Sequence, residues 1–259
     1  MKIFLSLLLS VVFCVSSYRA RWLSLSGSLV ASLFGASLLI FGSLTWIGSV
    51  LFFFASSSIL SKIGRHQADA PTLDVDHVRN AGQVLANGGI GWALLLMHVV
   101  FPNPLWFAGF AGAFAAATAD TWGTEIGRLA KGKTRSVLTW KDIESGVSGG
   151  ISWQGTLGGM FGAGCIALLA YAGSIHLSTG EILAIAGAGV AGSLVDSILG
   201  ATIQVRYQHQ TTGRITEEKT LDTEEYKPIS GITWVTNDIV NLLCTAVGAF
   251  LGALFLFIF

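Results

Sequence analysis

The feature that most constrains the fold is a series of eight apolar stretches separated by short turns or charged segments. A helix that crosses a membrane needs about 20 mostly apolar residues, because it has to span about 30 Å of hydrocarbon. The stretches cover residues 2–18, 22–41, 43–60, 80–101, 104–127, 156–174, 181–205 and 234–258. With 52% of its 259 residues hydrophobic and 12% charged, the chain is far less polar than a soluble domain. We predict an all-α, polytopic membrane bundle of about eight transmembrane helices, forming a single integral membrane domain over residues 1–259.

The first stretch could also be a signal peptide. Its basic start consists of Lys2, no small-residue cleavage site precedes Arg19, and another apolar stretch follows at once. These features favour a first helix that stays in the protein.

The basic residues are distributed unevenly between the two sides of the predicted bundle. All but one of the 15 Lys and Arg residues fall in alternate loops, and the exception is Lys2. The loop residues are Arg19, Arg21, Lys62, Arg65, Arg79, Arg128, Lys131, Lys133, Arg135, Lys141, Arg206, Arg214, Lys219 and Lys227. Because basic loops normally stay on the cytoplasmic side, we expect a protein of the bacterial plasma membrane whose loops at about 61–79, 128–155 and 206–233 face the cytoplasm. The net charge is zero, which argues against nucleic acid as a partner.

Polar residues recur at every fourth position near the charged-loop ends of four stretches, and this spacing places them on one face of a helix. The sets are Gln83, Asn87 and Gly91; Ala116, Asp120 and Thr124; Gly192, Asp196, Gly200 and Gln204; and Asn237, Asn241 and Thr245. The acidic residues near these ends are Asp120, Glu125, Asp196 and Asp238. We expect these four acids to lie in one layer just inside the membrane, where ionisable side chains normally face a cavity and mark function.

Two other interpretations of the acids remain open. Each acid could pair with a nearby Lys or Arg and simply hold the bundle together. Asn237 and Asp238 could also begin the last helix as capping residues.

Carboxylates gathered at one depth repel one another unless a cation lies between them, and hard oxygen ligands of this kind suit Mg²⁺. The four acids are therefore the candidate metal ligands. The adjoining loops supply positive charge in KGKTR (131–135), with Lys62, Arg79 and Arg128 nearby. A metal beside Lys and Arg is an arrangement that binds phosphate groups. The same basic run could instead be a membrane anchor.

The next loop, SGVSGGISWQGT (145–156), is rich in glycine and serine. Backbone N–H groups in such a loop, including those of Gly149 and Gly150, can form a concave anion site. A flexible linker would have a similar composition.

Two familiar catalytic patterns do not fit the chain. GRLAKGKT (127–134) matches the P-loop pattern, but a P-loop requires a preceding strand and a following helix. No Ser or Cys has a convincing base partner among the scattered histidines, which argues against nucleophilic hydrolysis. Transfer of a phosphate group to a substrate that is already a phosphate needs no general base, because that nucleophile is ionised at neutral pH.

Three stretches end in related sequences, SSILSKIGR (57–65), DTWGTEIGR (120–128) and DSILGATIQ (196–204). They suggest a threefold repeat of helical hairpins around a pseudo-axis. Lys62, Glu125 and Ala201 then occupy equivalent positions.

Five motifs together carry a family resemblance: RNAGQVLANGG (79–89), ADTWGTEIGRLAKGK (119–133), SGGISWQGTLGG (148–159), GSLVDSILGATIQ (192–204) and TNDIVNLL (236–243). Over roughly residues 20–259, the chain resembles an integral-membrane family that includes plant and cyanobacterial phytyl-phosphate kinase and an animal transmembrane protein of unclear role. The family is similar in character to the CTP-dependent membrane kinases and cytidylyltransferases of polyprenol and phosphatidate metabolism.

The resemblance implies a kinase that transfers a phosphate from a nucleoside triphosphate to an isoprenyl monophosphate. Its cofactors would be Mg²⁺ and the nucleotide, with CTP favoured over ATP, and its partners the lipid monophosphate and membrane lipids. Matching the motifs adds Asn87 to the four acids as catalytic residues. The expected cofactor contacts are Lys62, Arg79, Lys131, Lys133, Arg135, Gly149, Gly150, Asn237 and Asn241. The alternatives are a CTP-dependent cytidylyltransferase acting on a lipid phosphate, and a nucleotide-independent transporter or flippase.

Overall fold

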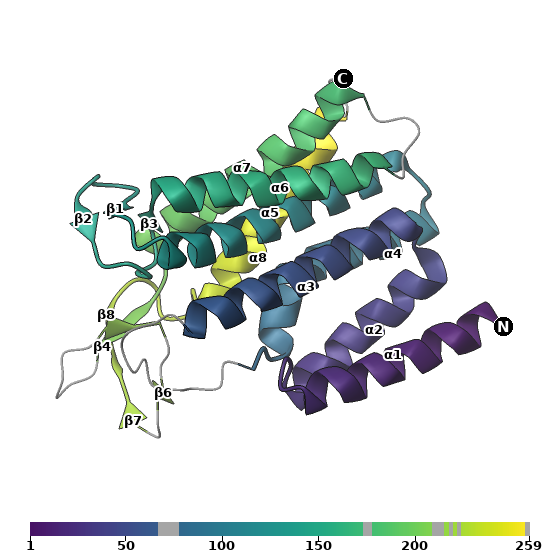
Figure 1. Ribbon diagram of the computed structural model, residues 1–259, viewed down its shortest axis with the longest axis horizontal. Coiled ribbons are helices and arrows are strands. Elements are labelled where there is room, and N and C mark those ends of the chain that lie inside the picture. The colour runs from purple at the N-terminus through teal and green to yellow at the C-terminus, as the bar shows by residue number, and fades with distance from the viewer. Residues whose placement is uncertain (67–77, 173–177, 209–214, 218–219, 222–223, 257–259) are drawn as a thin grey trace.

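The computed structural model describes residues 1–66, 78–172, 178–208, 215–217, 220–221 and 224–256. Within these residues the chain forms eight helices, and Figure 1 shows them as a bundle with short strands gathered near one end. The helices are α1 (Lys2–Arg19), α2 (Leu25–Phe41), α3 (Leu44–His66), α4 (Ala81–Val100), α5 (Pro104–Leu129), α6 (Trp153–Ala172), α7 (Thr179–Thr202) and α8 (Asn237–Phe255). The prediction of an all-α membrane bundle is confirmed. We call the end that carries the strands and the 20–24 connection the loop end.

Six of the eight described helices are long and apolar enough to cross a membrane, namely α1, α3, α4, α6, α7 and α8. Helix α2 is shorter, with 17 residues. Helix α5 has 26 residues but is rich in alanine and glycine, which contribute little hydropathy. The composition of α5 reflects its place in the bundle, because protein rather than lipid surrounds it.

Helix α5 is the centre of the bundle and packs against α3, α4, α6, α7 and α8. Every residue from Ala108 to Ala119 is buried. Small residues allow the backbones to approach closely, and a Cβ added at Gly112 would collide with the carbonyl oxygen of Gly248 on α8.

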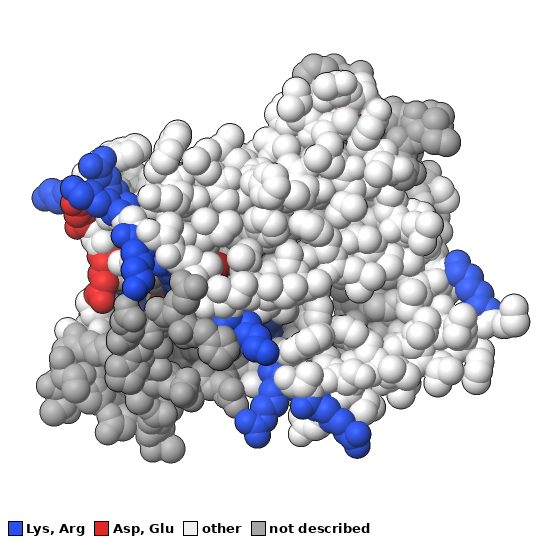
Figure 2. All heavy atoms as spheres, viewed as in Figure 1, with Lys and Arg blue, Asp and Glu red and all other residues white. Residues whose placement is uncertain are grey.

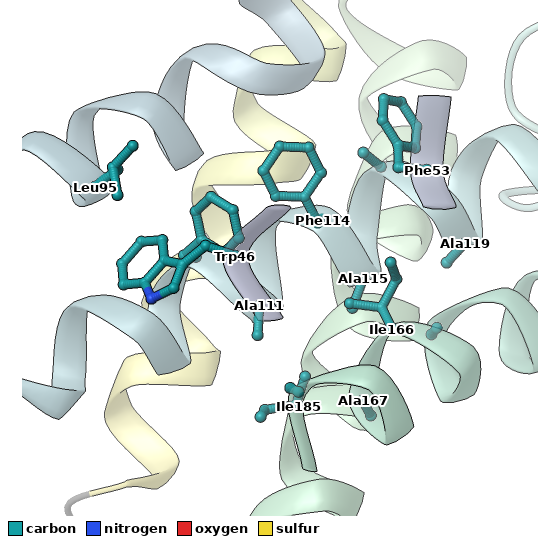
Figure 3. Packing of buried hydrophobic residues seen from close by; sticks show 14 of the residues in the cluster. Trp46, Phe53, Leu95, Ala111, Phe114, Ala115, Ala119, Ile166, Ala167 and Ile185 are labelled. Atoms are coloured by element: carbon teal, nitrogen blue, oxygen red, sulfur yellow. The ribbon is translucent and has the colours of Figure 1, made fainter. Parts of the chain in front are cut away.

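The aromatic part of the core lies around the first half of α5. Phe110 packs against Trp46 of α3 with ring centroids 4.4 Å apart and against Phe114 at 4.8 Å. Figure 3 shows Trp46, Phe114 and Leu95 on one side of α5, and Ile166 and Ile185 on the other. The large rings thus fill the half of the bundle away from the loops, which leaves the loop end to the polar residues of α5.

Side-chain caps fix where two helices begin. Asn80 accepts a hydrogen bond from the backbone N–H of Gln83, and the Gln83 side chain accepts one from the Asn80 backbone, both at 3.1 Å. This capping box stabilises the start of α4. Ser178 and Glu181 form a second capping box at the start of α7. At α8 the N-cap residue is Thr236, so Asn237 and Asp238 lie in the first helical turn.

The strands are short and form three small sheets. The first contains β1 (Thr134–Ser136), β2 (Asp142–Ile143) and β3 (Gly150–Ile151) in the order β2-β1-β3. The second contains β4 (Arg206–Gln208), β5 (Ile215–Thr216) and β8 (Lys227–Ser230) in the order β5-β4-β8, and β6 (Thr220–Leu221) pairs with β7 (Glu224–Glu225). All pairings are antiparallel. The GRLAKGKT motif begins within the last turn of α5 and ends at the first residue of β1, so the P-loop context of a preceding strand and a following helix is missing, as the sequence suggested.

Figure 2 shows Lys and Arg side chains around the loop end, while on the face in view the bundle between the two ends is almost free of charge. This distribution agrees with the uneven placement of basic residues in the sequence. Arg214, Lys219 and the side chain of Arg65 lie outside the described residues. The threefold repeat stays a prediction.

Candidate functional site

A cavity of about 320 Å³ opens at the loop end, among the ends of α5, α6, α7 and α8. Its polar wall includes Asp120, Thr124 and Glu125 from α5, and Asp196 from α7. Residues 145–152 and Glu217 cover it from the loops. The cavity therefore brings together side chains that are far apart in the sequence.

Three acidic residues of this wall interact electrostatically. Asp120 and Asp196 lie near enough to each other, and to Glu217, for their negative charges to repel. The Oδ2 atom of Asp196 is buried and has no hydrogen-bond partner in the described part of the chain. A buried carboxylate oxygen without a donor is costly, so this cluster favours a positively charged ligand.

Glu125 lies on the rim of the same cavity and is held by α3. The hydroxyl of Ser61 donates a 2.7 Å hydrogen bond to Glu125 Oε1. The other carboxylate oxygen lies beside Gly64, where an added Cβ would be 2.7 Å from Oε2. Helix α3 therefore positions this side chain.

The loop that contains residues 145–152 forms a second wall, and its backbone follows from its glycines. Gly149 has a φ of +81°, and a Cβ there would collide with Ala201 of α7. Gly146 has a φ of +90° and lies against the Arg128 guanidinium. Both φ values favour glycine. Gly149 and Gly150 line the cavity, but the Gly150 N–H donates a 3.0 Å hydrogen bond to the Val147 carbonyl, and the expected anion site stays a prediction.

Ser148 joins this loop to the rest of the site. Its hydroxyl donates to Glu217 Oε1 and accepts a 3.2 Å hydrogen bond from Gln204 Nε2. Arg206 Nη2 donates to the carbonyls of Ser148 at 2.8 Å and Gly200 at 3.1 Å. This network fixes the loop against the end of α7 and orients the Glu217 carboxylate.

Two arginines contribute positive charge to the lining, Arg79 before α4 and Arg128 near the end of α5. The backbone at Arg79 is fixed, because its carbonyl accepts a 3.0 Å hydrogen bond from the Ser24 N–H. Guanidinium groups suit phosphate because they can donate two parallel hydrogen bonds to it. The wall thus offers both carboxylates and phosphate-binding groups.

The structure brings together only part of the residue set expected from the sequence. Among the described residues, the lining contains Asp120, Glu125, Asp196, Arg79, Gly149, Gly150, Asn237 and Asn241. The expected residues that do not line it are Asp238, Asn87, Lys62, Lys131, Lys133 and Arg135.

These remaining residues lie in other places. Asp238 faces the start of α4, where a Cβ added at Gly82 would be 2.7 Å from its Oδ2. Asn87 lines a different, apolar cavity. Lys62, Lys133 and Arg135 are exposed, and Arg135 forms a 3.3 Å ion pair with Asp142. Their assigned roles stay predictions.

Sequence reasoning missed Glu217, to which we assigned no role because it lies in a polar loop of mixed charge. No spacing pattern distinguishes it from the other acids of that loop. Its position depends on the contacts of Ser148, Gln204 and Arg206, which connect two distant loops. In the sequence, the one feature that could have indicated this contact is Gln204, a polar residue at the end of the helical spacing pattern.

The side chains available as ligands decide whether this site could hold a metal ion. In the described part of the chain, no three His, Cys, Asp or Glu side chains form a ready-made metal site. Mg²⁺ is commonly held by one or two carboxylates together with substrate phosphates, so it does not need such a set. Asp196, with its unpartnered oxygen, and the neighbouring Asp120 fit this mode of binding.

Some known proteins are similar to this chain over nearly its whole length. It is 30% identical over 255 residues to an uncharacterised membrane protein of Methanocaldococcus jannaschii, covering 98% of this chain and 94% of that protein. It is 25% identical over 286 residues to Protein PGR of Arabidopsis thaliana, covering 98% and 96%. Similarity to the Arabidopsis Protein VTE6, chloroplastic, is partial, at 26% over 153 residues, or 59% of this chain and 38% of that protein. No solved structure matches the chain.

A family model described as integral membrane protein DUF92 matches residues 8–249. This match covers the five motifs that carried the resemblance. The chain therefore belongs to the DUF92 family of integral membrane proteins, which confirms the resemblance found in the sequence.

Proposed function

We propose that the protein is a Mg²⁺-dependent kinase that transfers a phosphate from a nucleoside triphosphate, CTP in preference to ATP, to an isoprenyl monophosphate such as phytyl phosphate. The product is the lipid diphosphate. The observation that carries the proposal is the buried Asp196 Oδ2, which has no hydrogen-bond partner among the described residues and lies beside Asp120 and Glu217 in a cavity that two arginines also line. The family resemblance supports a prenyl phosphate as the acceptor.

Asp196 and Asp120 are the residues that would hold Mg²⁺ in complex with the nucleotide phosphates. The ion would neutralise negative charge that otherwise opposes the approach of two phosphate groups. Glu217 and Glu125 lie at the edges of this pair, where Ser148 and Ser61 hold their carboxylates in place. The four side chains then define where the triphosphate lies.

Arg79, Arg128 and the backbone of residues 145–150 would bind and align the phosphates. An oxygen of the lipid phosphate forms a bond to the γ-phosphorus, and the bond from that phosphorus to the β–γ bridging oxygen breaks. The nucleoside diphosphate leaves with the electron pair of the broken bond. The attacking oxygen is already ionised, so alignment and charge neutralisation suffice and no general base is needed.

We also propose that the cavity faces the cytoplasm from a bacterial plasma membrane. The basic residues at the loop end support this orientation. The exposed Lys62, Lys131, Lys133 and Arg135 would attract nucleotide toward the site rather than touch it.

The test is a product assay with the purified full-length protein in detergent. It is incubated with Mg²⁺, CTP or ATP, and a panel of prenyl monophosphates, and the products are analysed by mass spectrometry. The proposal expects a lipid diphosphate and a nucleoside diphosphate, both lost when EDTA removes Mg²⁺. Pyrophosphate with a nucleotidyl lipid would identify the cytidylyltransferase alternative instead. Uptake of substrate by proteoliposomes without nucleotide would identify a transporter.

A pair of matched variants makes the assay specific for the cavity. Asp196→Asn removes a charge from the wall, while Asp142→Asn removes one from an exposed position in β2. The proposal expects activity to be lost in the first and kept in the second. Equal activity in both variants would contradict it.

A further inference from the structure

A second cavity of about 320 Å³ lies among α1, α2, α3 and α4 and differs from the first in character. Its wall is almost entirely apolar and includes Phe13, Leu38, Leu51 and Phe54. This volume falls near the lower end of the range of about 300–1,000 Å³ for ligand pockets. It is suited to a single slender apolar ligand.

The shape of the bundle explains why this space exists. Helices α2 and α3 are consecutive but pack sparsely against each other, whereas α2 packs well against α1 and α4, and α3 against α5. Helix α1 contributes Phe13 to the wall and reaches α3 through the ring contact between Phe13 and Phe54, whose centroids are 5.6 Å apart. The cavity therefore lies in the gap between α2 and α3, with α1 beside it.

The polar side chains of this wall gather mostly at the loop end. Arg79 precedes α4, and Gln83 and Asn87 lie in its first two turns. Of the two serines in the wall, Ser32 donates its hydroxyl to the Ser28 carbonyl at 2.6 Å, and Ser10 contributes one hydroxyl. The cavity is thus amphipathic along its length, with an apolar body and a cationic mouth.

Arg79 lines both cavities, so they are adjacent at this residue. The hydrogen bond from Ser24 N–H to its carbonyl fixes the backbone there. A ligand that fills both the apolar body and this mouth has a hydrocarbon chain at one end and an anionic group at the other. A phosphate at Arg79 would lie at the entrance of the cavity that contains Asp120 and Asp196.

We propose that the α1–α4 cavity binds the hydrocarbon chain of a single-chain lipid monophosphate whose phosphate lies at Arg79. This inference rests on the proposed function, and it assigns the acceptor subsite. Asn87 and Gln83 then lie beside the phosphate-bearing end of the lipid and not at the reaction centre.

Gly35 of α2 provides a precise way to fill the cavity. It lines the wall, and a Cβ added there would have no heavy atom within 4 Å. Gly35→Leu extends a side chain from this wall, its Cβ meets no neighbouring atom, and the change raises helix propensity. Gly187→Leu is the matched control, because Gly187 is an exposed glycine of α7, also faces open space and lines neither cavity.

The kinetic experiment compares a five-carbon and a twenty-carbon prenyl monophosphate as acceptors. Gly35→Leu is expected to lower kcat/KM for the long acceptor by about tenfold or more, because a few misplaced methylenes in an apolar pocket change binding by that amount. The short acceptor and the Gly187→Leu variant should keep wild-type values. Equal values for the long acceptor in both variants would overturn the inference.

A binding experiment separates this inference from the proposed function. A twenty-carbon lipid phosphate with a diazirine in its chain is photolysed with the wild-type protein in nanodiscs without nucleotide, and labelled peptides are mapped. Labelling of α2, α3 and the start of α4 supports the inference even if no phosphate transfer is found. Labelling elsewhere overturns it even if transfer is found, and so does equal labelling of these helices by a diazirine diacyl phospholipid.

Discussion

The hydroxyl of Ser61 near the end of α3 donates a 2.7 Å hydrogen bond to Oε1 of Glu125 near the end of α5. The contact joins two helices at the rim of the polar cavity. It also fixes a carboxylate whose other oxygen lies against Gly64. Precise placement of charge is what a phosphate-transfer site requires, since alignment supplies much of the rate.

Ser61→Ala is therefore expected to lower kcat/KM for phosphate transfer by roughly tenfold, the equivalent of about 1.4 kcal/mol lost from one hydrogen bond to a charged group. The measurement is steady-state kinetics together with the midpoint of thermal unfolding. Thr202→Ala is the control, because its hydroxyl bonds to the Ile198 carbonyl of its own helix and lies outside the cavity. Wild-type kinetics in Ser61→Ala would show that Glu125 needs no such support.

Much of the fold could be predicted because apolar length and spacing are local properties of the chain. The eight apolar stretches match the eight described helices. The recurrence of polar residues at every fourth position correctly placed Asp120 and Asp196 on helix faces that line one cavity. Asp238 was placed beside them because of its depth along the last helix and not because of this spacing. Consecutive residues of a helix point about 100° apart, so Asn237 and Asn241 face the cavity while Asp238 turns toward Gly82.

The loops could not be predicted in the same way. The position of Glu217 depends on Ser148, and that of Ser148 on Arg206 and Gln204, so the site is completed by contacts between segments far apart in sequence. The basic run at 131–135 follows the general rule that loops on the cytoplasmic side are rich in Lys and Arg. That rule does not say where such a side chain points. In the structure Lys131, Lys133 and Arg135 of this run are exposed, while Thr134 is buried and lines the cavity.

Asp196→Asn is expected to separate activity from stability. Activity should fall by at least about a hundredfold, since a carboxylate that would hold Mg²⁺ is lost. The free energy of unfolding should stay the same or rise, because Asp196 Oδ2 has no partner among the described residues and its charge repels those of Asp120 and Glu217. Activity assays and thermal unfolding in the same detergent measure both effects. A less stable but active variant would mean that Asp196 has a structural role.

Glu217→Gln tests the residue that the sequence did not reveal. The change keeps an acceptor for Ser148 but removes the charge beside Asp120 and Asp196. We expect kcat/KM to fall by about tenfold or more at saturating Mg²⁺, and the Mg²⁺ concentration for half-maximal activity to rise. Glu144→Gln, at an exposed position outside the cavity, should behave as wild type. Identical Mg²⁺ titrations for Glu217→Gln and wild type would show that Glu217 does not contribute to Mg²⁺ binding.

Lys133 and Arg128 should differ in how salt affects their variants. Arg128 lines the cavity, so Arg128→Gln is expected to raise the KM for nucleotide by about tenfold or more at any salt concentration. Lys133 is exposed and outside the lining, so Lys133→Gln should change KM by less than about threefold. That smaller effect should vanish near 1 M salt, where the Debye length is about 3 Å. A large, salt-independent effect at Lys133 would place it in direct contact with the nucleotide.

Gly112→Ala tests the central packing of the bundle. A Cβ at this position would collide with the Gly248 carbonyl oxygen, so α5 and α8 would have to move apart. Such overpacking is expected to lower the free energy of unfolding by about 1–3 kcal/mol, measured by denaturation in a fixed detergent. Gly187→Ala should be neutral or stabilising by up to about 1 kcal/mol, because Gly187 is exposed, faces open space and alanine favours the helix. Because Gly112 lies between Ala111 and Ala113 in a fully buried segment that leads to Asp120, the Gly112 variant should also lose activity in proportion to its loss of folded protein. Equal stability of the two variants would show that α5 and α8 are not held at this close approach.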